Sequence, residues 1–390
     1  MSVVGIQSEP LVRVASELVV YVGRSDVAVP EGAGRLTDRD VYASTLTTAL
    51  GEAALLVILD ALSFPYEMLS EAQWDVPMLV SVPDELPAGD VVDVLAPVFD
   101  RLGFFDLFAV TSDEAWEALR ARHAWGMGQR VPVRADDPEG VVRYAVDLLQ
   151  RDADAADAAE ADEVYDPVSY WRRRGKEVGP QSQHRAICSI HHDLRFNKAM
   201  HRAQAGALVP QFDEVRELSG GRSRPLRVLE VGTGVGRWAT FFPAGVDVFS
   251  GVDISASMVE IARENFPEHT FETVDQDARL PQESDSFDLV MSITVLHHNP
   301  PVLRRALLRE MWRVTRPTGH LLLLEQVVAA APRPQSTVYR MSPADLVEDV
   351  LRASLGRVVL EHARAVRYPH DEMYRSLLLR LTKLGRSTQW

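Results

Sequence analysis

The sequence predicts an α/β protein in which Rossmann-like alternation of strands and helices occurs twice. Its 390 residues exceed one average domain. Short apolar runs alternate with amphipathic helical stretches on both sides of an acidic segment, a pattern typical of open parallel sheets. In the second half, one apolar run leads directly into the glycine cluster Gly232–Gly236. These observations predict two α/β domains, the second with a ligand-binding loop.

The first domain is predicted over residues 1–150, where apolar runs are bounded by proline or aspartate. This stretch contains no glycine-rich phosphate loop. Its expected strands are Leu55–Ala61, Met78–Val82 and Leu107–Val110, and its expected helices are Val91–Leu102, Asp113–His123 and Asp136–Gln150. We therefore expect an accessory Rossmann-like domain.

An acidic segment at residues 151–166 separates the two halves. It combines alanine with seven acidic residues, one arginine and no apolar face. This composition is typical of a solvated linker or an exposed helix. Residues 167–222 are then expected to form a helical cap, and residues 223–390 to form the second α/β domain.

The second domain repeats the strand–helix alternation. Its expected strands are Leu226–Val231, Val246–Val252, Phe287–Thr294, His320–Val327 and Arg357–Ala365. Helices are expected at Ala256–Asn265, Val302–Val314 and Pro343–Ser354. The overlapping stretch Leu308–Gly319 is also expected to be helical, with Pro317 and Gly319 as the signals that stop it.

Composition restricts the partners and the compartment. The formal net charge is −15, which disfavours nucleic acid as a partner. Cys188 is the single cysteine, so neither an internal disulfide nor a thiolate metal site is expected. The first ten residues lack a signal-peptide pattern and the apolar runs are strand-sized. We therefore expect a soluble, cytoplasmic protein without a membrane partner.

The glycine cluster reads GxGxG, and Arg237 occupies the place of the last glycine in the dinucleotide fingerprint GxGxxG. Glycine lets the chain turn sharply after a strand and lets a ligand approach the backbone. The departure from the fingerprint favours a ligand that lacks a pyrophosphate. Such a cluster alone is weak evidence, because many are only tight turns.

Two acidic positions strengthen this interpretation. Asp253 ends the second expected strand, where a carboxylate can accept hydrogen bonds from both ribose hydroxyls. The alternative is a helix N-cap, a role that Ser255 fills better. Asp277 resembles the end of a further strand, the third of this domain, which would precede the fourth strand Phe287–Thr294. From there it could accept a hydrogen bond from an adenine amino group.

Taken together, these motifs resemble the class I S-adenosylmethionine-dependent methyltransferases, and in particular the small-molecule branch with the ubiquinone and menaquinone enzymes. The resemblance rests on ExGxGxG from Glu230, on Asp253, on Asp277-Ala278, on FDLV from Phe287 and on the PxG–LLLLE ending, and it covers about Leu226–Glu325. It implies a mostly parallel seven-stranded sheet and S-adenosyl-L-methionine as the cofactor.

The resemblance also implies roles for individual residues. Glu230 would lie near the methionine ammonium, Asp253 would hold the ribose, and Asp277 would bind the adenine amino group. The full set of expected cofactor-binding residues is Glu230, Gly232, Thr233, Gly234, Gly236, Asp253, Ile254, Met258, Asp277, Ala278, Arg279, Ser292, Tyr170 and Arg174. Tyr170, Trp171 and Arg174 are the residues that could close over the cofactor, although a helix packed on the sheet explains them equally well.

Two histidines are the expected catalytic residues. His297 and His298 follow the fourth strand, where acceptor and cofactor would meet, and histidine suits a general base at neutral pH. The alternative is that one contacts the backbone and the other is solvated; His191 and His192 are second candidates. Neither pair has a carboxylate at metal-ligand spacing, so no metal is expected. Glu325, at the end of the fifth strand, could face the acceptor or be structural.

The acceptor is the least defined part of this prediction. We expect a small molecule, with methylation of a hydroxyl on a sugar-containing or secondary metabolite. The alternatives are methylation of nitrogen or carbon, and a non-catalytic scaffold that only binds the cofactor. The first domain faintly resembles one Rossmann-like half of a GT-B glycosyltransferase. Otherwise it is expected to make homo-oligomer contacts or to position the acceptor.

Overall fold

The computed structural model describes residues 18–23, 27–37, 43–51, 53–82, 101–122, 128–158, 165–177, 183, 194–327, 339, 341–368 and 371–385. The chain divides into two compact units. Unit 1 comprises residues 1–161 and 188–202, and unit 2 comprises residues 162–187 and 203–390. The long helix α8 (Leu194–Leu218) contributes its first turns to unit 1 and the remainder to unit 2.

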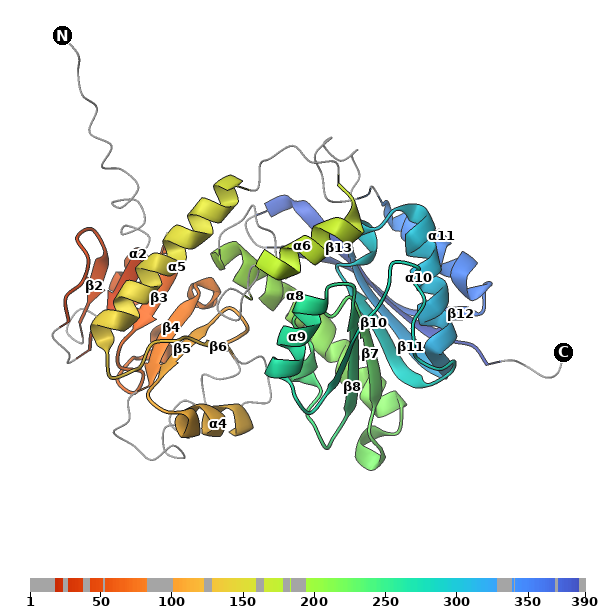
Figure 1. The fold of residues 1–390 in the computed structure, drawn as a ribbon, viewed down its shortest axis with the longest axis horizontal. Helices are drawn as coiled ribbons and strands as arrows, with labels where there is room; N and C mark the ends of the chain where they lie inside the picture. The colour runs from red at the N-terminus through yellow and green to blue at the C-terminus, as the bar shows by residue number, and fades with distance from the viewer. Residues whose placement is uncertain are drawn as a thin grey trace, which may run out of the picture. The chain divides into compact units, whose positions relative to one another are not determined.

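Unit 1 is built on a six-stranded parallel sheet with the order β2-β1-β3-β4-β5-β6 (Figure 1). The strands are β1 (Leu18–Tyr21), β2 (Gly34–Leu36), β3 (Leu55–Ile58), β4 (Met78–Val82), β5 (Leu107–Val110) and β6 (Gln129–Arg130). Its helices include α2 (Ala43–Leu50), α4 (Asp113–Arg122) and α5 (Pro138–Ala158). Strands β1, β3, β4 and β5 are buried at every position, as expected of a parallel sheet covered on both faces.

A buried ion pair ties the 188–202 segment into unit 1. Lys198 is almost fully buried, and its Nζ donates to Asp106 at 2.7 Å and to the Val76 carbonyl at 2.9 Å. Asp106 also accepts the backbone N–H of Met78 and of Gly103. Burial lowers the pKa of Lys198, and the neighbouring Asp106 opposes this shift. Because both charges have hydrogen-bonding partners, these bonds offset the cost of desolvating the pair, which holds residues 194–202 in unit 1.

Unit 2 contains a seven-stranded sheet with the order β12-β13-β11-β10-β7-β8-β9. Its strands are β7 (Arg227–Val231), β8 (Val248–Asp253), β9 (Thr270–Thr273), β10 (Phe287–Ile293), β11 (Thr315–Gln326), β12 (Val358–Tyr368) and β13 (Asp371–Lys383). Only β13 runs against its neighbours; the other pairings among β7 to β11 are parallel. The expected α/β fold with a mostly parallel seven-stranded sheet is confirmed.

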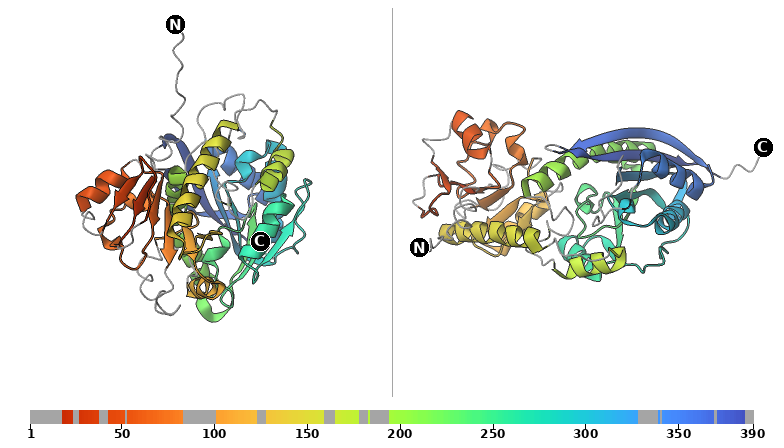
Figure 2. Two further views of the ribbon diagram at one scale, coloured as in Figure 1. Left: turned by 60° about the vertical axis from the view of Figure 1, so that its left-hand side comes forward. Right: turned by 90° about the horizontal axis from the view of Figure 1, so that it is seen from above.

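Helices cover this sheet on both faces. They are α6 (Pro167–Glu177), the second part of α8, α9 (Ala256–Asn265), α10 (Pro301–Val314) and α11 (Pro343–Ser354). Helix α8 runs along the β12–β13 hairpin (Figure 2), to which Glu214 is tied by Arg380 and Gln204 by the Tyr368 hydroxyl at 3.3 Å. None of the helices in the described part of the chain is long and apolar enough to cross a membrane.

The structure confirms one of two expectations for the helix after β10 and corrects the other. The helix expected over Val302–Val314 is α10 and ends at Val314, whereas residues 315–319 of the helical stretch expected over Leu308–Gly319 belong to β11, which begins at Thr315. The Thr315 hydroxyl donates to the Met311 carbonyl at 2.7 Å, so that a side chain closes the helix before Pro317. Residues 151–158 continue helix α5, whereas residues 83–100, which include the expected helix Val91–Leu102, lie outside the described residues. The predicted domain boundaries stay a prediction.

Candidate active site

The candidate site lies at the carboxyl edge of the unit 2 sheet, where the strand order reverses. Strand β7 pairs with β8 on one side and with β10 on the other. The connections that leave β7, β8 and β10 therefore emerge next to one another. Open α/β sheets bind their ligands at such a switch point.

The glycine loop that follows β7 is shaped by three glycines with positive φ. Gly232, Gly234 and Gly236 have φ angles of 78°, 56° and 82°, a region that favours glycine. The N–H groups of Gly232 and Thr233 both donate to the Val252 carbonyl, at 2.8 and 3.0 Å. A Cβ at Gly232 would lie only 2.3 Å from a methyl carbon of Val295. Position 232 is therefore restricted to glycine by conformation and by space.

Glu230 places a buried carboxyl group directly before this loop. Its side chain accepts a hydrogen bond from the Thr233 hydroxyl at 2.8 Å, and the residue is 2% exposed. Burial raises the pKa of Glu230 to about 8, although Thr233 and the charge of Arg237 act in the opposite direction. A ligand ammonium next to this group would favour the ionised carboxylate. The predicted position near the methionine ammonium fits this chemistry.

Asp253 ends β8 beside the glycine loop. One carboxylate oxygen accepts the N–H of Gly234 and the other the N–H of Ser255, both at 2.9 Å. Burial raises the pKa of Asp253, against the effect of these backbone donors. Ser255 is the N-cap residue of α9, but its side chain makes no capping hydrogen bond. Each carboxylate oxygen has a second lone pair, so ribose hydroxyls can still be accepted.

The expected adenine side of the site lies after β8 and β9. Met258 is buried on α9 and Ile254 is partly buried. Ala278 is buried with a φ of 61°, an uncommon conformation for a residue other than glycine. The exposed Asp277 accepts the Arg279 N–H at 3.1 Å, and Arg279 is itself exposed. Backbone strain concentrates at functional sites, which favours the predicted contact of Ala278 with a ligand ring.

A histidine–glutamate pair lies after β10. His297 is buried in a short 3-10 helix (Leu296–His298), and its Nδ1 lies 2.7 Å from the Glu325 carboxylate at the end of β11. Glu325 also accepts the backbone N–H of Val295 and of His297, each at 3.2 Å, and the Ser292 hydroxyl at 3.0 Å. Ser292, expected to contact the cofactor, thus bonds to Glu325. The hydrogen bonds fix the imidazole ring of His297.

The turn between β10 and His297 is strained. Thr294 has a φ of 60°, which is exceptional for a β-branched residue. Its N–H donates to the Leu324 carbonyl at 2.7 Å, which holds the turn in place. The turn directs Val295 against Gly232 and starts the short helix that contains His297. Such strain costs about 1–3 kcal/mol, and the strained turn places Val295 against the glycine loop.

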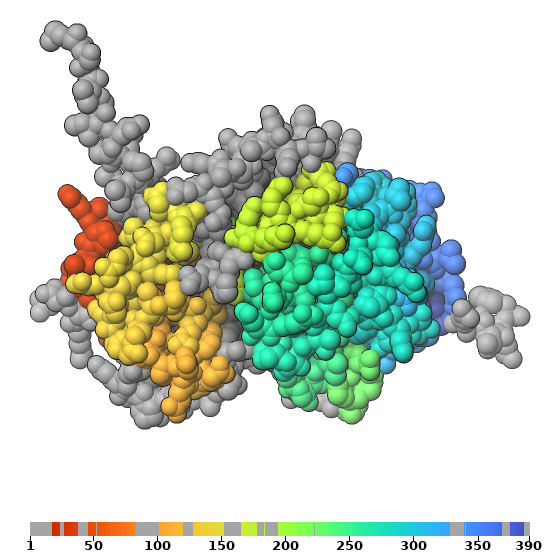
Figure 3. All heavy atoms as spheres, viewed as in Figure 1, coloured from red at the N-terminus to blue at the C-terminus, as the bar shows by residue number. Residues whose placement is uncertain are grey.

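Helix α6 covers this edge of the sheet (Figure 3). Gly175 packs so closely on α9 that a Cβ there would lie 1.9 Å from the Ser255 hydroxyl. Trp171 contacts the ring of His298, with centroids 5.0 Å apart. Tyr170 is half-buried beside Trp171, and Arg174 is buried. The residues expected to close over the cofactor are therefore brought to the site, and their roles stay a prediction.

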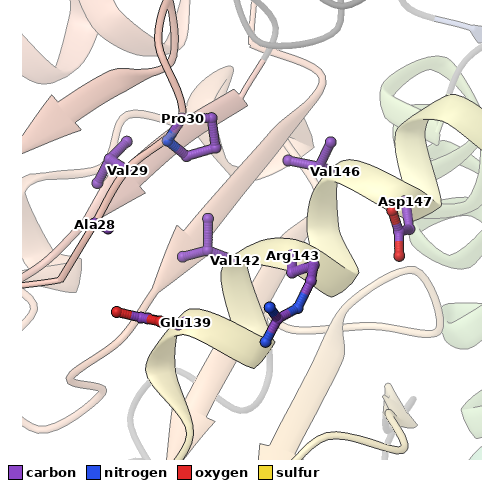
Figure 4. Close-up of a pocket in the computed structure, with 8 residues that line it drawn as sticks. All are labelled: Ala28, Val29, Pro30, Glu139, Val142, Arg143, Val146 and Asp147. Atoms are coloured by element: carbon purple, nitrogen blue, oxygen red, sulfur yellow. The ribbon is translucent and has the colours of Figure 1, made fainter.

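The remaining candidate residues and the hollow in unit 1 give less support for a functional site. His191, His192 and Cys188 lie outside the described residues. Within the described ranges, no group of three or more His, Cys, Asp or Glu side chains could hold a metal ion. A hollow of about 340 Å³ in unit 1 lies between residues 28–30 and α5, where Val142 and Val146 project towards Val29 and Pro30 (Figure 4).

The strand order, with its single reversed strand, and the site at the carboxyl edge define a class I methyltransferase fold. Comparison with known proteins supports this assignment, since residues 228–319 match the family model described as a methyltransferase domain. The second unit thus contains a class I S-adenosylmethionine-dependent methyltransferase domain. Glu230, the glycine loop, Asp253 and Ala278 form a set of groups that fits this cofactor.

Two curated proteins share part of this sequence. Methyltransferase GfsG of Streptomyces halstedii is 33% identical over 135 residues, which are 32% of this chain and 46% of that protein. The uncharacterized methyltransferase YcgJ of Bacillus subtilis (strain 168) is 34% identical over 110 residues, or 27% of this chain and 43% of that protein. The chain thus spans less than half the length of either relative.

Among solved structures, magnesium protoporphyrin IX methyltransferase from Synechocystis PCC 6803 with bound SAM is 20% identical. The similarity covers 57% of this chain and 100% of that one, with a TM-score of 0.43, which is too low to carry an argument. None of these similarities confirms the predicted resemblance of the first domain to a GT-B half.

Proposed function

We propose that the protein transfers a methyl group from S-adenosylmethionine to a hydroxyl group of a small secondary metabolite, with His297 as the general base. The observation that carries this proposal is the 2.7 Å contact between Nδ1 of His297, which follows β10, and the carboxylate of Glu325 at the end of β11. The sequence and fold supply the methyltransferase domain, and this pair supplies a group that can activate oxygen.

The buried carboxylate determines which nitrogen of His297 can act as a base. Glu325 accepts a hydrogen bond, so the proton of a neutral imidazole lies on Nδ1 and the lone pair on Nε2. Because three further donors hold the carboxylate, the ring orientation is fixed. Glu325 is therefore a positioning residue, which also stabilises the imidazolium that forms when Nε2 takes a proton.

When bound, the cofactor supplies an electrophilic methyl group on a sulfonium and leaves as S-adenosylhomocysteine. The acceptor oxygen forms the new bond to carbon, and its proton passes to Nε2 of His297. Glu230, Asp253 and the glycine loop would hold the cofactor, and Helix α6 would exclude water from this edge. Bringing the reacting atoms together supplies much of the rate.

The test measures S-adenosylhomocysteine formation by the full-length protein with a panel of hydroxyl compounds. Substitution His297→Ala is expected to lower turnover by about 10²- to 10⁴-fold, with unchanged cofactor affinity by calorimetry. The conservative Glu325→Gln should leave affinity unchanged but shift the pH profile of turnover, because the imidazolium loses its charged partner. The matched control is His269→Ala, on a partly buried histidine whose ring contacts Phe249 and Phe266 in tilted arrangements.

Two results would contradict the proposal. Tight cofactor binding without turnover on any acceptor would favour the non-catalytic scaffold. Methylation of amines in preference to alcohols, with full activity in His297→Ala, would favour the nitrogen acceptor.

A further inference from the structure

A cluster of aromatic side chains surrounds the end of β10 in unit 2. Trp171 and Tyr170 come from α6, and their centroids lie 5.1 Å apart. Tyr165 lies 5.3 Å from Tyr170 and 6.0 Å from Tyr339. The Trp171 ring packs edge-on against His298, which lies 4.1 Å from His297. Segments far apart in the sequence thus place four aromatic rings beside the proposed base.

Hydrogen bonds tie this cluster to the backbone of the two histidines. The Tyr165 hydroxyl donates to the His298 carbonyl at 3.1 Å. The Tyr339 N–H donates to the His297 carbonyl at 2.7 Å. The rings are therefore positioned relative to His297 and not only packed on one another.

Partial exposure distinguishes this cluster from an ordinary core. Tyr165, Tyr170, Trp171 and Tyr339 are all of intermediate exposure, whereas the core residues Leu296 and Val290 have no exposed surface. Partly exposed aromatic side chains next to a polar group are typical of small-molecule sites. Trp171, which packs edge-on against His298, also lies after β10, whereas the expected adenine contacts follow β8 and β9.

We propose that this aromatic cluster is the wall of the acceptor site and that the acceptor hydroxyl sits on a planar aromatic ring, as in a phenol. The proposal rests on the proposed function. Aromatic walls favour flat, apolar rings through edge-to-face and stacked contacts. A sugar would instead need several convergent polar side chains, and the residues of the wall are aromatic.

The base agrees with this acceptor class. A phenol ionises near pH ~10, as tyrosine does, whereas water, the nearest reference for an aliphatic hydroxyl, ionises near pH ~16. A phenol therefore gives up its proton to a histidine base far more readily than an aliphatic alcohol does. Proton transfer from the phenol to Nε2 of His297 leaves a phenolate-like oxygen as the nucleophile, and the methyl group then moves to it.

The experiment compares the binding of two probes to the full chain saturated with S-adenosylhomocysteine. The probes are 2-naphthol and its saturated analogue decahydro-2-naphthol, which carries a hydroxyl at the same position but is an aliphatic alcohol without a planar ring. We expect 2-naphthol to bind at least about 10-fold more tightly, which corresponds to about 1.4 kcal/mol. Substitution Trp171→Leu should remove most of this preference, and Trp171→Phe should retain it.

The matched control is Trp312→Leu, a tryptophan of the same unit whose ring contacts Lys383 at the opposite end of α10. It is expected to leave the preference unchanged. Equal binding of the two probes, or an unaltered preference in Trp171→Leu with intact S-adenosylhomocysteine affinity, would overturn the aromatic acceptor. If the wild-type chain does not bind S-adenosylhomocysteine, it is the proposed function that fails.

Discussion

The two sheets of this protein offer the same kind of location but differ in what they place there. Each is parallel near its centre, and each has a switch point, between β1 and β3 in unit 1 and between β7 and β10 in unit 2. Each has a glycine with positive φ after the inner strand, Gly23 in one and Gly232 in the other. Strand order alone therefore does not make a site.

The difference lies in the partners of an acidic residue at the carboxyl end of a strand next to each inner strand, Asp60 after β3 in unit 1 and Asp253 at the end of β8 in unit 2. In unit 1, Asp60 accepts hydrogen bonds from Ser63 at 2.7 Å and from the Leu62 N–H at 3.2 Å, all within one turn. In unit 2, Asp253 reaches the glycine loop of the neighbouring strand. A carboxylate that joins two loops can shape a ligand cradle, whereas one used by its own turn stabilises that turn.

The largest expected effect tests the glycine loop of unit 2, residues 232–236. Substitution Gly232→Ala forces a Cβ to within 2.3 Å of Val295 and strains a φ of 78°. We expect cofactor affinity to fall by about 100-fold or more, because the loop must move. Calorimetric titration with S-adenosylhomocysteine measures this loss.

Two companion variants separate the causes. Gly245→Ala adds a Cβ at a φ of 80° with nothing within 4 Å, so it reports conformational strain alone and should leave affinity unchanged. The double variant Gly232→Ala, Val295→Ala removes the two methyl contacts at 2.3 and 2.9 Å, leaves the Cβ of position 295 at 3.1 Å, and should recover part of the affinity. Full affinity in the single variant would show that the loop does not contact the cofactor.

The next effect compares the two aspartates directly. Substitution Asp253→Ala should weaken cofactor binding by about 10- to 100-fold, the loss of one charged hydrogen-bonding group. Asp60→Ala should leave cofactor affinity unchanged and lower the stability of its turn by about 1 kcal/mol. Isothermal calorimetry and thermal unfolding measure the two quantities. Equal losses of affinity in both variants would mean that the comparison between the sheets is wrong.

The sequence was sufficient to locate helices and strands where apolar runs are strong and clearly bounded. Helices Ala256–Asn265 and Pro343–Ser354 were predicted with their observed limits, since serines precede both. Strand β13 was not located, because polar and apolar residues mix along Asp371–Lys383 and its pairing with β11 is a tertiary contact. Strands β1 and β2 were missed because they are short: β1 is the apolar run LVVY of four residues and β2 has three residues, GRL.

For the site, the sequence identified residue types at strand ends but not their pairing. It left open which histidine acts and whether Glu325 is structural, since 28 residues separate His297 from Glu325. Only the adjacency of β10 and β11 joins them. Tyr165 and Tyr339 carried no motif at all, because contacts between distant segments bring them to His298 and His297.

The smallest expected effect concerns Glu230, the buried carboxyl group directly before the glycine loop of unit 2. The described residues at the switch point of unit 1 include no matching buried carboxyl group. The pKa of Glu230 is about 8 in the folded protein, raised from 4.5 by burial. Between these two pH values the folded state binds more protons than the unfolded state, so the free energy of unfolding falls as pH rises through this window.

Ionised Glu230 would hold the cofactor ammonium. Affinity should therefore rise several-fold from pH 6 to pH 8, with proton release on binding. Calorimetry in buffers of different ionisation enthalpy measures that release. Glu230→Gln, which cannot ionise, should abolish both the release and the pH dependence, and the survival of either would place the ammonium elsewhere.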